Sequence, residues 1–386
     1  MFEAYVGHSN DPDSSAAIAE VLQQCQTGLA GKTPQAGVLF AAMDFDHSLI
    51  LGQIQATFSG IELIGSTTNG EMSSVLGFQE DSLTLLVFCT DRLEIKAGLG
   101  RGLAQNTPLA VKEAIASATS QLSTPAQLCL TFPESIMVNG VSVLSALKQG
   151  LGTQLPILGA MAADDYNFTQ TYQFFNSEVV SDAVPILLFA GELAYSHGVA
   201  SGWQPLGKCG RVTKVVGNVI HEIDGNRALD FYEHYLGDGG ETTGYAVYAL
   251  AVFEVEQENF YLRAPSSYDA TAGTLTFFSD IPVGARVQIT QAARTEIVAA
   301  ADTSLQQALE AYPGRSPAAA LLISCAARRR LLGTQASAEY ESIKAKLPPN
   351  LPCCGLYSFG EISPLDRASE TQFHNQTFVT LLLGET

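Results

Sequence analysis

Acidic side chains follow a glycine at three places in the sequence, and each place comes after an apolar, strand-like run. A glycine after a buried strand permits positive φ and lets backbone N–H groups face a neighbouring molecule. A carboxylate beside such a turn can then orient a polar ligand. Capping of the local turn is the alternative role for each carboxylate. The three pairs are Gly65 with Glu71, Gly159 with Asp164 and Asp165, and Gly360 with Glu361.

The first of these turns is the richest in polar groups, since residues 64–71 read Ile-Gly-Ser-Thr-Thr-Asn-Gly-Glu. Hydroxyl, amide and carboxylate groups of this kind suit a small polar metabolite such as an amino acid. We therefore expect a small-ligand site built from all three turns. The predicted ligand-binding residues are Gly65, Ser66, Thr67, Thr68, Asn69, Glu71, Gly159, Asp164, Asp165, Cys325, Arg328, Gly360 and Glu361.

Each turn closes a segment that has the pattern of a strand, an amphipathic helix and a second strand. The three leading strands are Gly37–Ala41, Gln127–Thr131 and Ala320–Ser324. Roughly 25 to 32 residues separate each leading strand from its glycine, which is about the length of one strand-helix-strand unit. In open α/β sheets, ligand-binding crevices form beyond the carboxyl ends of the strands. The three turns are therefore expected to meet around one shared pocket.

Antiparallel strands are predicted between and after these units. Tyr172–Phe175, Glu178–Val180 and Ala183–Ala190 have hairpin spacing. The predicted fold class is therefore mixed α/β, with repeated strand-helix-strand units and parallel and antiparallel sheets in two halves. The remaining predicted elements include strands at Ala246–Val255, Phe260–Arg263, Thr274–Phe278 and Val287–Thr290, and helices at Ser14–Gln26 and Ile297–Glu310.

Composition indicates a globular protein folded throughout. The 386 residues are 46% hydrophobic and 15% charged, which suits two domains or one large α/β assembly with an insertion. A net charge of −19 would repel nucleic acid and anionic membrane surfaces. Because neither an export signal nor a membrane-length apolar run is visible, we expect a soluble, cytoplasmic protein with no membrane partner. The odd number of cysteines, seven, suggests buried free thiols.

Cys325 is the best candidate for a nucleophile, because it lies at the end of a strand close to Arg328. No nucleophile elbow, phosphate-binding loop or zinc-protease motif accompanies it. A small residue packed beneath the pocket is the alternative for Cys325, and the predicted protein is not an enzyme.

Arg328–Arg330 is the only basic cluster. A solvated helix start is the favoured interpretation of this cluster, with an anion contact at Arg328 as the alternative.

An ordered set of short motifs resembles the FIST domain family, which is found in bacterial signal-transduction proteins. Each fragment alone is weak, but together they cover nearly the whole chain in family order. The first departure from the family pattern is Asn226-Arg227 before the Ala-Leu helix. The second, Ala326-Ala327 after Cys325, leaves the role of Arg328 open. The matching motifs are Gly65–Glu71, Gly159–Asp165, Gly202–Gly207, Val212–Lys214, Ile223–Gly225, Ala228–Tyr232, Leu236–Gly237, Ser324–Cys325 and Tyr357–Ile362.

The resemblance implies a domain division and a function. Residues 1–30 would lead into an N-terminal FIST domain at 31–215 and a C-terminal FIST domain at 216–386. The protein would be a sensor that binds a small ligand. Since the sequence ends after the second domain, occupancy would be reported to a separate partner, such as a histidine kinase or a diguanylate-cyclase system.

A haem-binding, nitric-oxide-sensing branch of the same family is the alternative that the resemblance implies. The six histidines lack the spacing of a structural zinc site, but a single haem ligand needs no spacing pattern. His234, in an aromatic helix, is the first candidate for the haem ligand, and His197 is the second.

Overall fold

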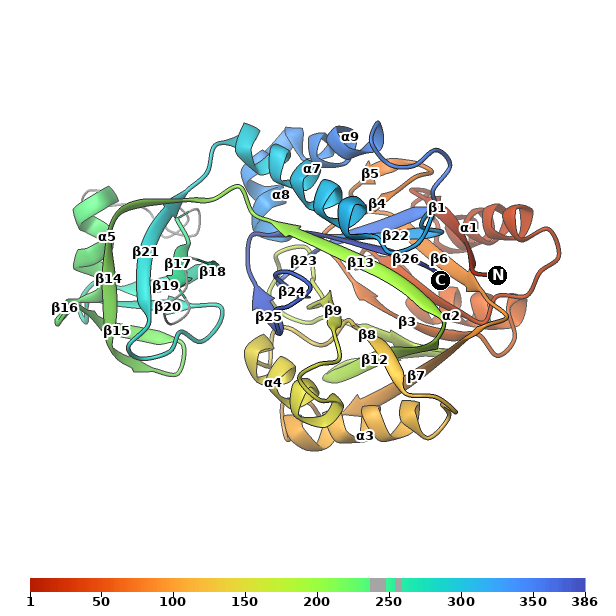
Figure 1. Cartoon of the computed structure of the whole chain (residues 1–386), viewed down its shortest axis with the longest axis horizontal. Helices are drawn as coiled ribbons and strands as arrows, with labels where there is room; N and C mark the ends of the chain where they lie inside the picture. The colour runs from red at the N-terminus through yellow and green to blue at the C-terminus, as the bar shows by residue number, and fades with distance from the viewer. Residues whose placement is uncertain (237–247, 254–258, 386) are drawn as a thin grey trace. The chain divides into compact units, whose positions relative to one another are not determined.

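The computed structural model describes residues 1–236, 248–253 and 259–385, which form two compact units (Figure 1). The larger unit contains residues 1–200 and 298–373 and the chain from Thr377 onward. The smaller unit contains Ser201–Ile297 together with His374–Gln376. The smaller unit is therefore an insertion into the chain of the larger one.

Three copies of one arrangement build the larger unit. Each copy runs through a strand, a helix, a strand, a second helical segment, a strand, a hairpin and a last strand. The first copy consists of β1 (Glu3–Ser9), α1 (Ser14–Leu29), β2 (Ala36–Ala41), α2 (His47–Thr57), β3 (Glu62–Thr67), β4 (Glu71–Ser73), β5 (Gly77–Gln79) and β6 (Leu83–Cys89). The second consists of β7 (Leu93–Arg101), α3 (Thr107–Thr119), β8 (Ala126–Thr131), α4 (Gly140–Leu151), β9 (Ile157–Ala160), β10 (Gln173–Phe175), β11 (Glu178–Val180) and β12 (Ala183–Gly191).

The third copy is split by the inserted unit after its first strand. It consists of β13 (Leu193–Ala200), α7 (Arg294–Ala311), β22 (Ala319–Cys325), α8 (Ala326–Leu332), η1 (Gly333–Gln335), α9 (Ser337–Lys344), β23 (Cys353–Ser358), β24 (Glu361–Pro364), β25 (Thr371–His374) and β26 (Phe378–Glu385). The order of elements is otherwise that of the first two copies, so the repeat seen in the sequence extends to whole sheets.

Each copy has its own six-stranded sheet, and each sheet is completed by a hairpin from another copy. The strand orders are β1-β6-β2-β3-β10-β11, β7-β12-β8-β9-β24-β25 and β13-β26-β22-β23-β4-β5. The hairpin β4–β5 of the first copy thus extends the third sheet, β10–β11 of the second extends the first, and β24–β25 of the third extends the second. This cyclic exchange means that no copy has a complete sheet alone.

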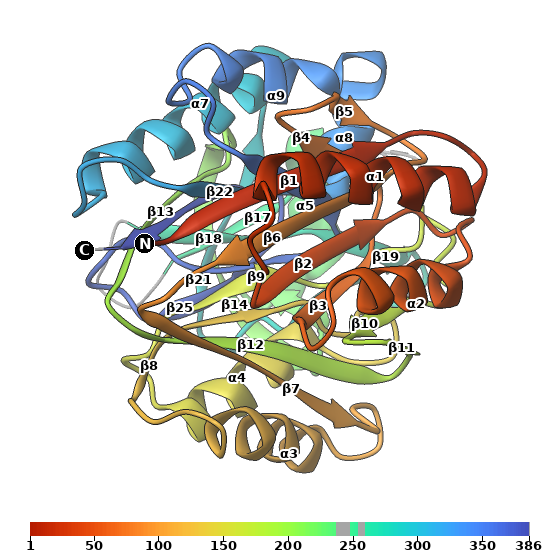
Figure 2. The ribbon, with the colours of Figure 1, turned by 90° about the vertical axis from the view of Figure 1, so that its right-hand side faces the viewer.

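Apolar residues on both faces of the strands explain the layered packing. The strands β2, β6, β12 and β22 are nearly continuous apolar runs that are buried along their whole length apart from the last residue of β12. One face packs into a central core shared by the three sheets, and the other face packs against the helices of its own copy. The helices therefore form the outside of this unit and the strands its interior (Figure 2).

Close contact between each first strand and its helix depends on a glycine. A Cβ at Gly7 in β1 would lie 2.3 Å from the carbonyl oxygen of Val21 in α1. A Cβ at Gly198 in β13 would lie 2.0 Å from the carbonyl oxygen of Ser304 in α7. No real Cβ approaches a backbone oxygen so closely, so a side chain at either position would force the helix away from the sheet.

The smaller unit is an antiparallel sheet on which the helix α5 (Ala228–Leu236) packs. Its strand order is β18-β17-β21-β14-β15-β20-β19, with the two-residue strand β16 (Asn226–Arg227) paired to β15. The other strands are β14 (Gln204–Val216), β15 (Val219–Ile223), β17 (Leu250–Phe253), β18 (Phe260–Arg263), β19 (Pro265–Asp269), β20 (Thr274–Phe277) and β21 (Arg286–Gln291).

The predicted fold class is confirmed: the chain is mixed α/β, with repeated strand-helix-strand units and mixed sheets. The strand predicted at Ala246–Val255 is present as Leu250–Phe253, while residues 246, 247, 254 and 255 lie outside the described residues. The division at residues 215 and 216 stays a prediction; β14 is continuous across residue 215, and the compact units change at 200/201 and 297/298. Within the described part of the chain, no helix has the length and apolarity needed to cross a membrane.

Replacing Gly198 by alanine is expected to destabilise the protein by about 1–3 kcal/mol, because the added methyl group overpacks β13 against α7. Gly52 offers a matched control, since it is an exposed helical glycine with open space around its Cβ position. Gly52→Ala should raise stability by up to about 1 kcal/mol. Urea unfolding measures both effects, and equal midpoints for the two variants would contradict the close packing.

Candidate functional site

The three glycine-containing corners of the larger unit meet, and backbone hydrogen bonds link them in a ring. The first corner follows β3, the second follows β9 and the third follows β23. Each corner is bonded to the other two, so segments far apart in sequence form one junction. The three bonds, each 2.9 Å long, run from Ala163 N to Thr67 O, from Asn69 N to Tyr357 O, and from Met161 N to Gly360 O.

The glycines at this junction serve strand packing. A Cβ at Gly65 would lie 1.8 Å from the carbonyl oxygen of Leu39, and one at Gly159 would lie 1.9 Å from that of Thr131. Gly360 is in contact with the ring of Phe373. These contacts explain why glycine occupies the three positions without a bound ligand. The glycines allow neighbouring parts of the fold to approach closely, and this explanation replaces the expectation that their backbone N–H groups face a ligand.

Glu71 is completely buried at the start of β4 and accepts hydrogen bonds at both carboxylate oxygens. Thr68 donates to one oxygen, and Ser82 donates to the other at 2.5 Å. Ser82 also contacts His8, whose second ring nitrogen lies 2.7 Å from Ser73. Burial raises the pKa of Glu71 to about 8, although Ser82, Thr68 and the charge of Arg329 oppose the shift. Burial lowers the pKa of His8 to about 4, so this imidazole is neutral.

Glu361 is the corresponding buried carboxylate of the third corner. It accepts hydrogen bonds from the backbone and the hydroxyl of Thr377, at 3.0 and 2.8 Å, and from Ser358 at 3.3 Å. Burial raises its pKa to about 7, while bonds from Thr377 and Cys325 oppose the shift. Cys325 ends β22 and is 5% exposed. The carboxyl groups of Glu71 and Glu361 thus accept hydrogen bonds from donors of their own corners.

Asp164 folds the loop that follows the second corner. Its carboxylate accepts from the backbone N–H groups of Phe168, Thr169 and Gln170, at 2.9, 2.7 and 3.2 Å. The loop carries three non-glycine residues with positive φ, namely Asp165 at 51°, Tyr166 at 63° and Phe168 at 52°. Such angles are uncommon for these residue types and persist only where surrounding contacts hold them, often at ligand-binding sites.

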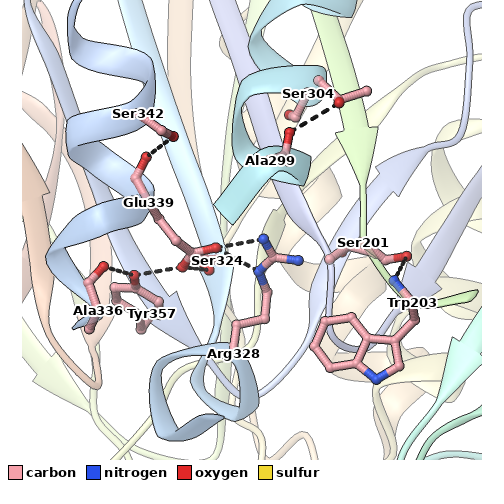
Figure 3. Close-up of polar contacts among 12 residues, drawn as sticks. Ser201, Trp203, Ala299, Ser304, Ser324, Arg328, Ala336, Glu339, Ser342 and Tyr357 are labelled. Atoms are coloured by element: carbon pink, nitrogen blue, oxygen red, sulfur yellow. Dashed lines mark hydrogen bonds and ion pairs between the residues drawn. The ribbon is translucent and has the colours of Figure 1, made fainter. Parts of the chain in front are cut away.

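Arg328 is buried in an ion pair, which corrects the prediction of a solvated helix start. Its guanidinium donates to Glu339 at 2.5 and 2.8 Å, and neither side chain is exposed. Ser324 and Tyr357 donate to the other oxygen of Glu339, at 3.0 and 2.7 Å (Figure 3). The pair ties α8 and α9 to the sheet beneath them. Breaking a buried ion pair typically costs about 3–5 kcal/mol, so Arg328 has a clear structural role.

Arg329, the next residue of α8, reaches the junction and was missed in the sequence analysis. Its Nη1 donates to the backbone oxygen of Asn69 at 2.6 Å and lies 3.2 Å from the carboxylate of Asp165. Its Nη2 lies 3.1 Å from Glu80. Successive helix positions point about 100° apart, and no sequence signal showed which arginine faces the corner.

Asn69 completes this group. Its side-chain oxygen accepts from the backbone N–H of Asp165 at 2.6 Å, while its amide nitrogen is buried and has no hydrogen-bond partner among the described residues. Tyr166 packs beside Arg329, with its ring centre 5.6 Å from the guanidinium carbon, and donates to the backbone oxygen of Ala326 at 2.7 Å. We call Asn69, Glu80, Asp165, Tyr166 and Arg329 the corner cluster.

The remaining predicted ligand-binding residues are buried. Thr67 binds the backbone of Tyr172, and the hydroxyl of Ser66 has no hydrogen-bond partner within the described part of the chain. Of the thirteen predicted residues, Asp165 alone has an exposed side chain, at 53%. The structure therefore brings the three corners together but buries most of their polar groups.

The two candidate haem ligands lie in different settings. His234 is exposed on α5, where it contacts Tyr235 edge-to-face, and no apolar pocket surrounds its ring in the described residues. The described residues around His234 therefore give no support to a haem site there. His197 is 6% exposed in β13 and lines a cavity of about 290 Å³. That volume lies at the lower limit for small-molecule sites, and polar and charged residues line much of the cavity, so the cavity does not fit haem either.

No group of histidine, cysteine and carboxylate side chains that could hold a metal ion occurs among residues 1–236, 248–253 and 259–385. The cysteines in these ranges are free thiols, including the adjacent Cys353 and Cys354, both buried in β23.

Stability is expected to fall between about pH 6.5 and pH 8, where His8 and the other histidines whose pKa burial lowers are largely neutral in both the folded and the unfolded state. In the folded protein, burial raises the pKa of Glu71 to about 8 and of Glu361 to about 7, against an ordinary value of 4.5. The folded state therefore holds protons that the unfolded chain has released. This stabilisation is complete below about pH 4.5 and is lost as pH rises through the folded pKa values, at about 1.4 kcal/mol per pKa unit.

Glu71→Gln should flatten this pH dependence, because the amide replaces a neutral carboxyl group. The exposed Glu178→Gln is the control and should leave the slope unchanged. Urea unfolding from pH 6.5 to pH 8 measures both variants. A wild-type stability that rises over this range would contradict the account.

Comparison with known families matches two consecutive family models to the chain. The FIST N domain model matches residues 35–226, and the FIST C domain model matches residues 228–364. An uncharacterised protein, MJ1623 of Methanocaldococcus jannaschii, is 31% identical over 134 residues, which are 33% of this chain and 26% of that protein. The chain thus matches about a quarter of the length of this relative.

Solved structures show only distant likeness. A chorismatase is 9% identical, with a TM-score of 0.35 and coverage of 99% of this chain and 98% of its own. A cyanuric acid hydrolase from A. caulinodans is 13% identical, with a TM-score of 0.28 and coverage of 52% of this chain and 72% of its own.

Proposed function

The chain belongs to the FIST family, a family of signal-transduction sensor domains, and from this we propose that it binds a small zwitterionic metabolite, such as an amino acid, at the corner cluster. The protein then acts as a non-enzymatic sensor. Binding is reported to a separate signalling partner.

The observation that carries this proposal is the placement of Arg329. Its guanidinium is 14% exposed and lies between the Asp165 and Glu80 carboxylates, which are 53% and 61% exposed. A guanidinium binds a carboxylate in a bidentate manner, and a carboxylate binds an ammonium group. The cluster therefore offers partners for both charged groups of an amino acid within a few ångströms. The amide nitrogen of Asn69, which makes no hydrogen bond of ordinary geometry with the described residues but lies near the hydroxyl of Tyr166, is a further donor beside them.

The ligand would shift the conformational equilibrium of the loop that follows Asp164. Asp165 and Tyr166 of the cluster both lie in this loop, and both have positive φ. A ligand can shift a conformational equilibrium only by binding one arrangement more tightly than the other. Contacts to Asp165 and Arg329 would couple the strained loop to α8, and the partner would read this change. A histidine kinase or a diguanylate-cyclase protein is the kind of partner proposed.

Thermal-shift and calorimetric titrations with a panel of amino acids test the proposal. At least one compound should raise the melting temperature of the wild-type protein. Asp165→Asn and Arg329→Gln should each weaken its binding by about 10- to 100-fold, because each removes a charged hydrogen bond of about 1.5–3 kcal/mol.

Arg101→Gln provides the matched control, since Arg101 forms an exposed ion pair with Glu178 at 2.7 Å, away from the cluster. This variant should bind like the wild type. The proposal is rejected if no amino acid changes the melting temperature, or if Arg329→Gln binds with wild-type affinity.

A cysteine-dependent reaction at Cys325 is not supported by its surroundings. The thiol is 5% exposed and its hydrogen-bonding neighbour is the carboxyl group of Glu361. Nucleophilic cysteines instead lie in exposed, electropositive settings.

In native protein treated with iodoacetamide, we expect the exposed Cys209 to react at least about tenfold faster than Cys325. Peptide mass spectrometry measures both rates, with Cys209→Ser as control, and rapid labelling of Cys325 would favour the enzyme alternative.

A further inference from the structure

A cavity of about 290 Å³ lies in the larger unit, apart from the residues of the corner cluster. Its walls come from β13, from the loop between α4 and β9, and from the loop between β24 and β25. Tyr195 and His197 project into it from β13, Arg367 lines it from the last of these loops, and Thr371 lines it from the start of β25. The cavity is large enough for a small metabolite and holds several polar side chains.

His197 is the most unusual group in this cavity. Its side chain is 6% exposed, and neither ring nitrogen makes a hydrogen bond of ordinary geometry with the described residues, although the backbone oxygens of Pro364 and Asp366 lie near enough to raise its pKa against the effect of burial. Buried polar groups are nearly always hydrogen-bonded, so the ring of His197 has hydrogen-bonding capacity left for a ligand. Alternate residues of a strand face the same side, so Tyr195 and His197 point together, while Ser196 binds the backbone of α7 on the opposite side.

Among the charged side chains of the described residues around the cavity, the cationic group of Arg367 is available to bind a ligand. Glu370 is paired with Lys148 at 2.5 Å, and Asp366 accepts from the backbone of Ala368 and from Ser369, each at 2.8 Å. Arg367 forms no ion pair or hydrogen bond in the described part of the chain, yet its charge acts on both Tyr195 and His197. The acidic neighbours thus have partners within the protein, whereas the exposed guanidinium of Arg367 faces solvent.

We propose that this cavity is a second ligand site, in which Arg367 and His197 bind the oxyanion of a small carboxylate or phosphate compound. The guanidinium provides paired N–H donors that match such an oxyanion, and a ring N–H of His197 provides another. Ser369 and Thr371 lie in the same wall, where the hydroxyl of Ser369 donates to Asp366 and that of Thr371 accepts from the backbone of Ile157. The site goes beyond the proposed amino-acid site, because it uses none of the residues of the corner cluster.

Proton NMR of the histidine side chains tests this site directly, with inorganic phosphate and pyruvate as separate probes. The C–H resonances of His197, assigned through His197→Gln, should shift on titration of the wild-type protein. Arg367→Gln should weaken binding of the effective probe by at least about tenfold, and because Arg367 is exposed, this variant should fold normally. Tighter binding of pyruvate would indicate a carboxylate ligand, and tighter binding of phosphate a phosphorylated one.

Arg92→Gln is the control, since Arg92 is another exposed arginine, paired with Glu192 at 3.0 Å. It should bind the probe like the wild type, as should Arg329→Gln, which separates this site from the corner cluster. Unmoved His197 resonances would overturn the proposal, as would wild-type affinity in Arg367→Gln. A Soret band that disappears in His197→Gln would also overturn it, because haem would then be the partner of the imidazole.

Discussion

The ring of backbone hydrogen bonds among the three corners is the constraint on which the larger unit depends. Each copy gives its hairpin to another copy's sheet, so the sheets can be completed only together. The bonds from Asn69, Met161 and Ala163 join the corners where the chain passes from one sheet to the next. Since none of the three sheets is complete without a hairpin from another copy, the corners are expected to be held in place by the whole unit. A site built on them is positioned by strands from all three copies.

Burial divides the polar residues of the junction into two groups. Glu71, Glu361 and Arg328 are fully buried and satisfy neighbouring groups of the fold, as Figure 3 shows for the ion pair of Arg328 with Glu339. Asp165 and Arg329 lie at the surface of the same junction and retain contact with solvent. A net charge of −19 makes a partly exposed arginine flanked by two carboxylates a distinctive feature of the surface. A different observation, a cavity lined by a buried imidazole and an arginine outside any ion pair among the described residues, points to His197 and Arg367.

The sequence was sufficient to predict the strand-helix-strand units and their glycine turns, because strands buried on both faces give continuous apolar runs. It did not reveal the exchange of hairpins, since β4–β5 and β24–β25 are short and pair with strands far away in the chain. The third copy was only partly recognisable in the sequence, because the inserted unit separates β13 from α7. Arg329 rather than Arg328 reaches the junction, and the sequence could not show this for a local reason: adjacent arginines on a short helix carry no periodic signal that shows which one faces the junction.

Native-state hydrogen exchange at the amides of Asn69, Met161 and Ala163 tests the joined corners most directly. If the corners are held by the whole unit, these three amides should exchange only through global unfolding, with the same free energy as buried amides of β6 such as that of Leu85. Exchange of any of the three by local opening, several kcal/mol easier than that of Leu85, would show that the corners are not held as one junction and would contradict the account.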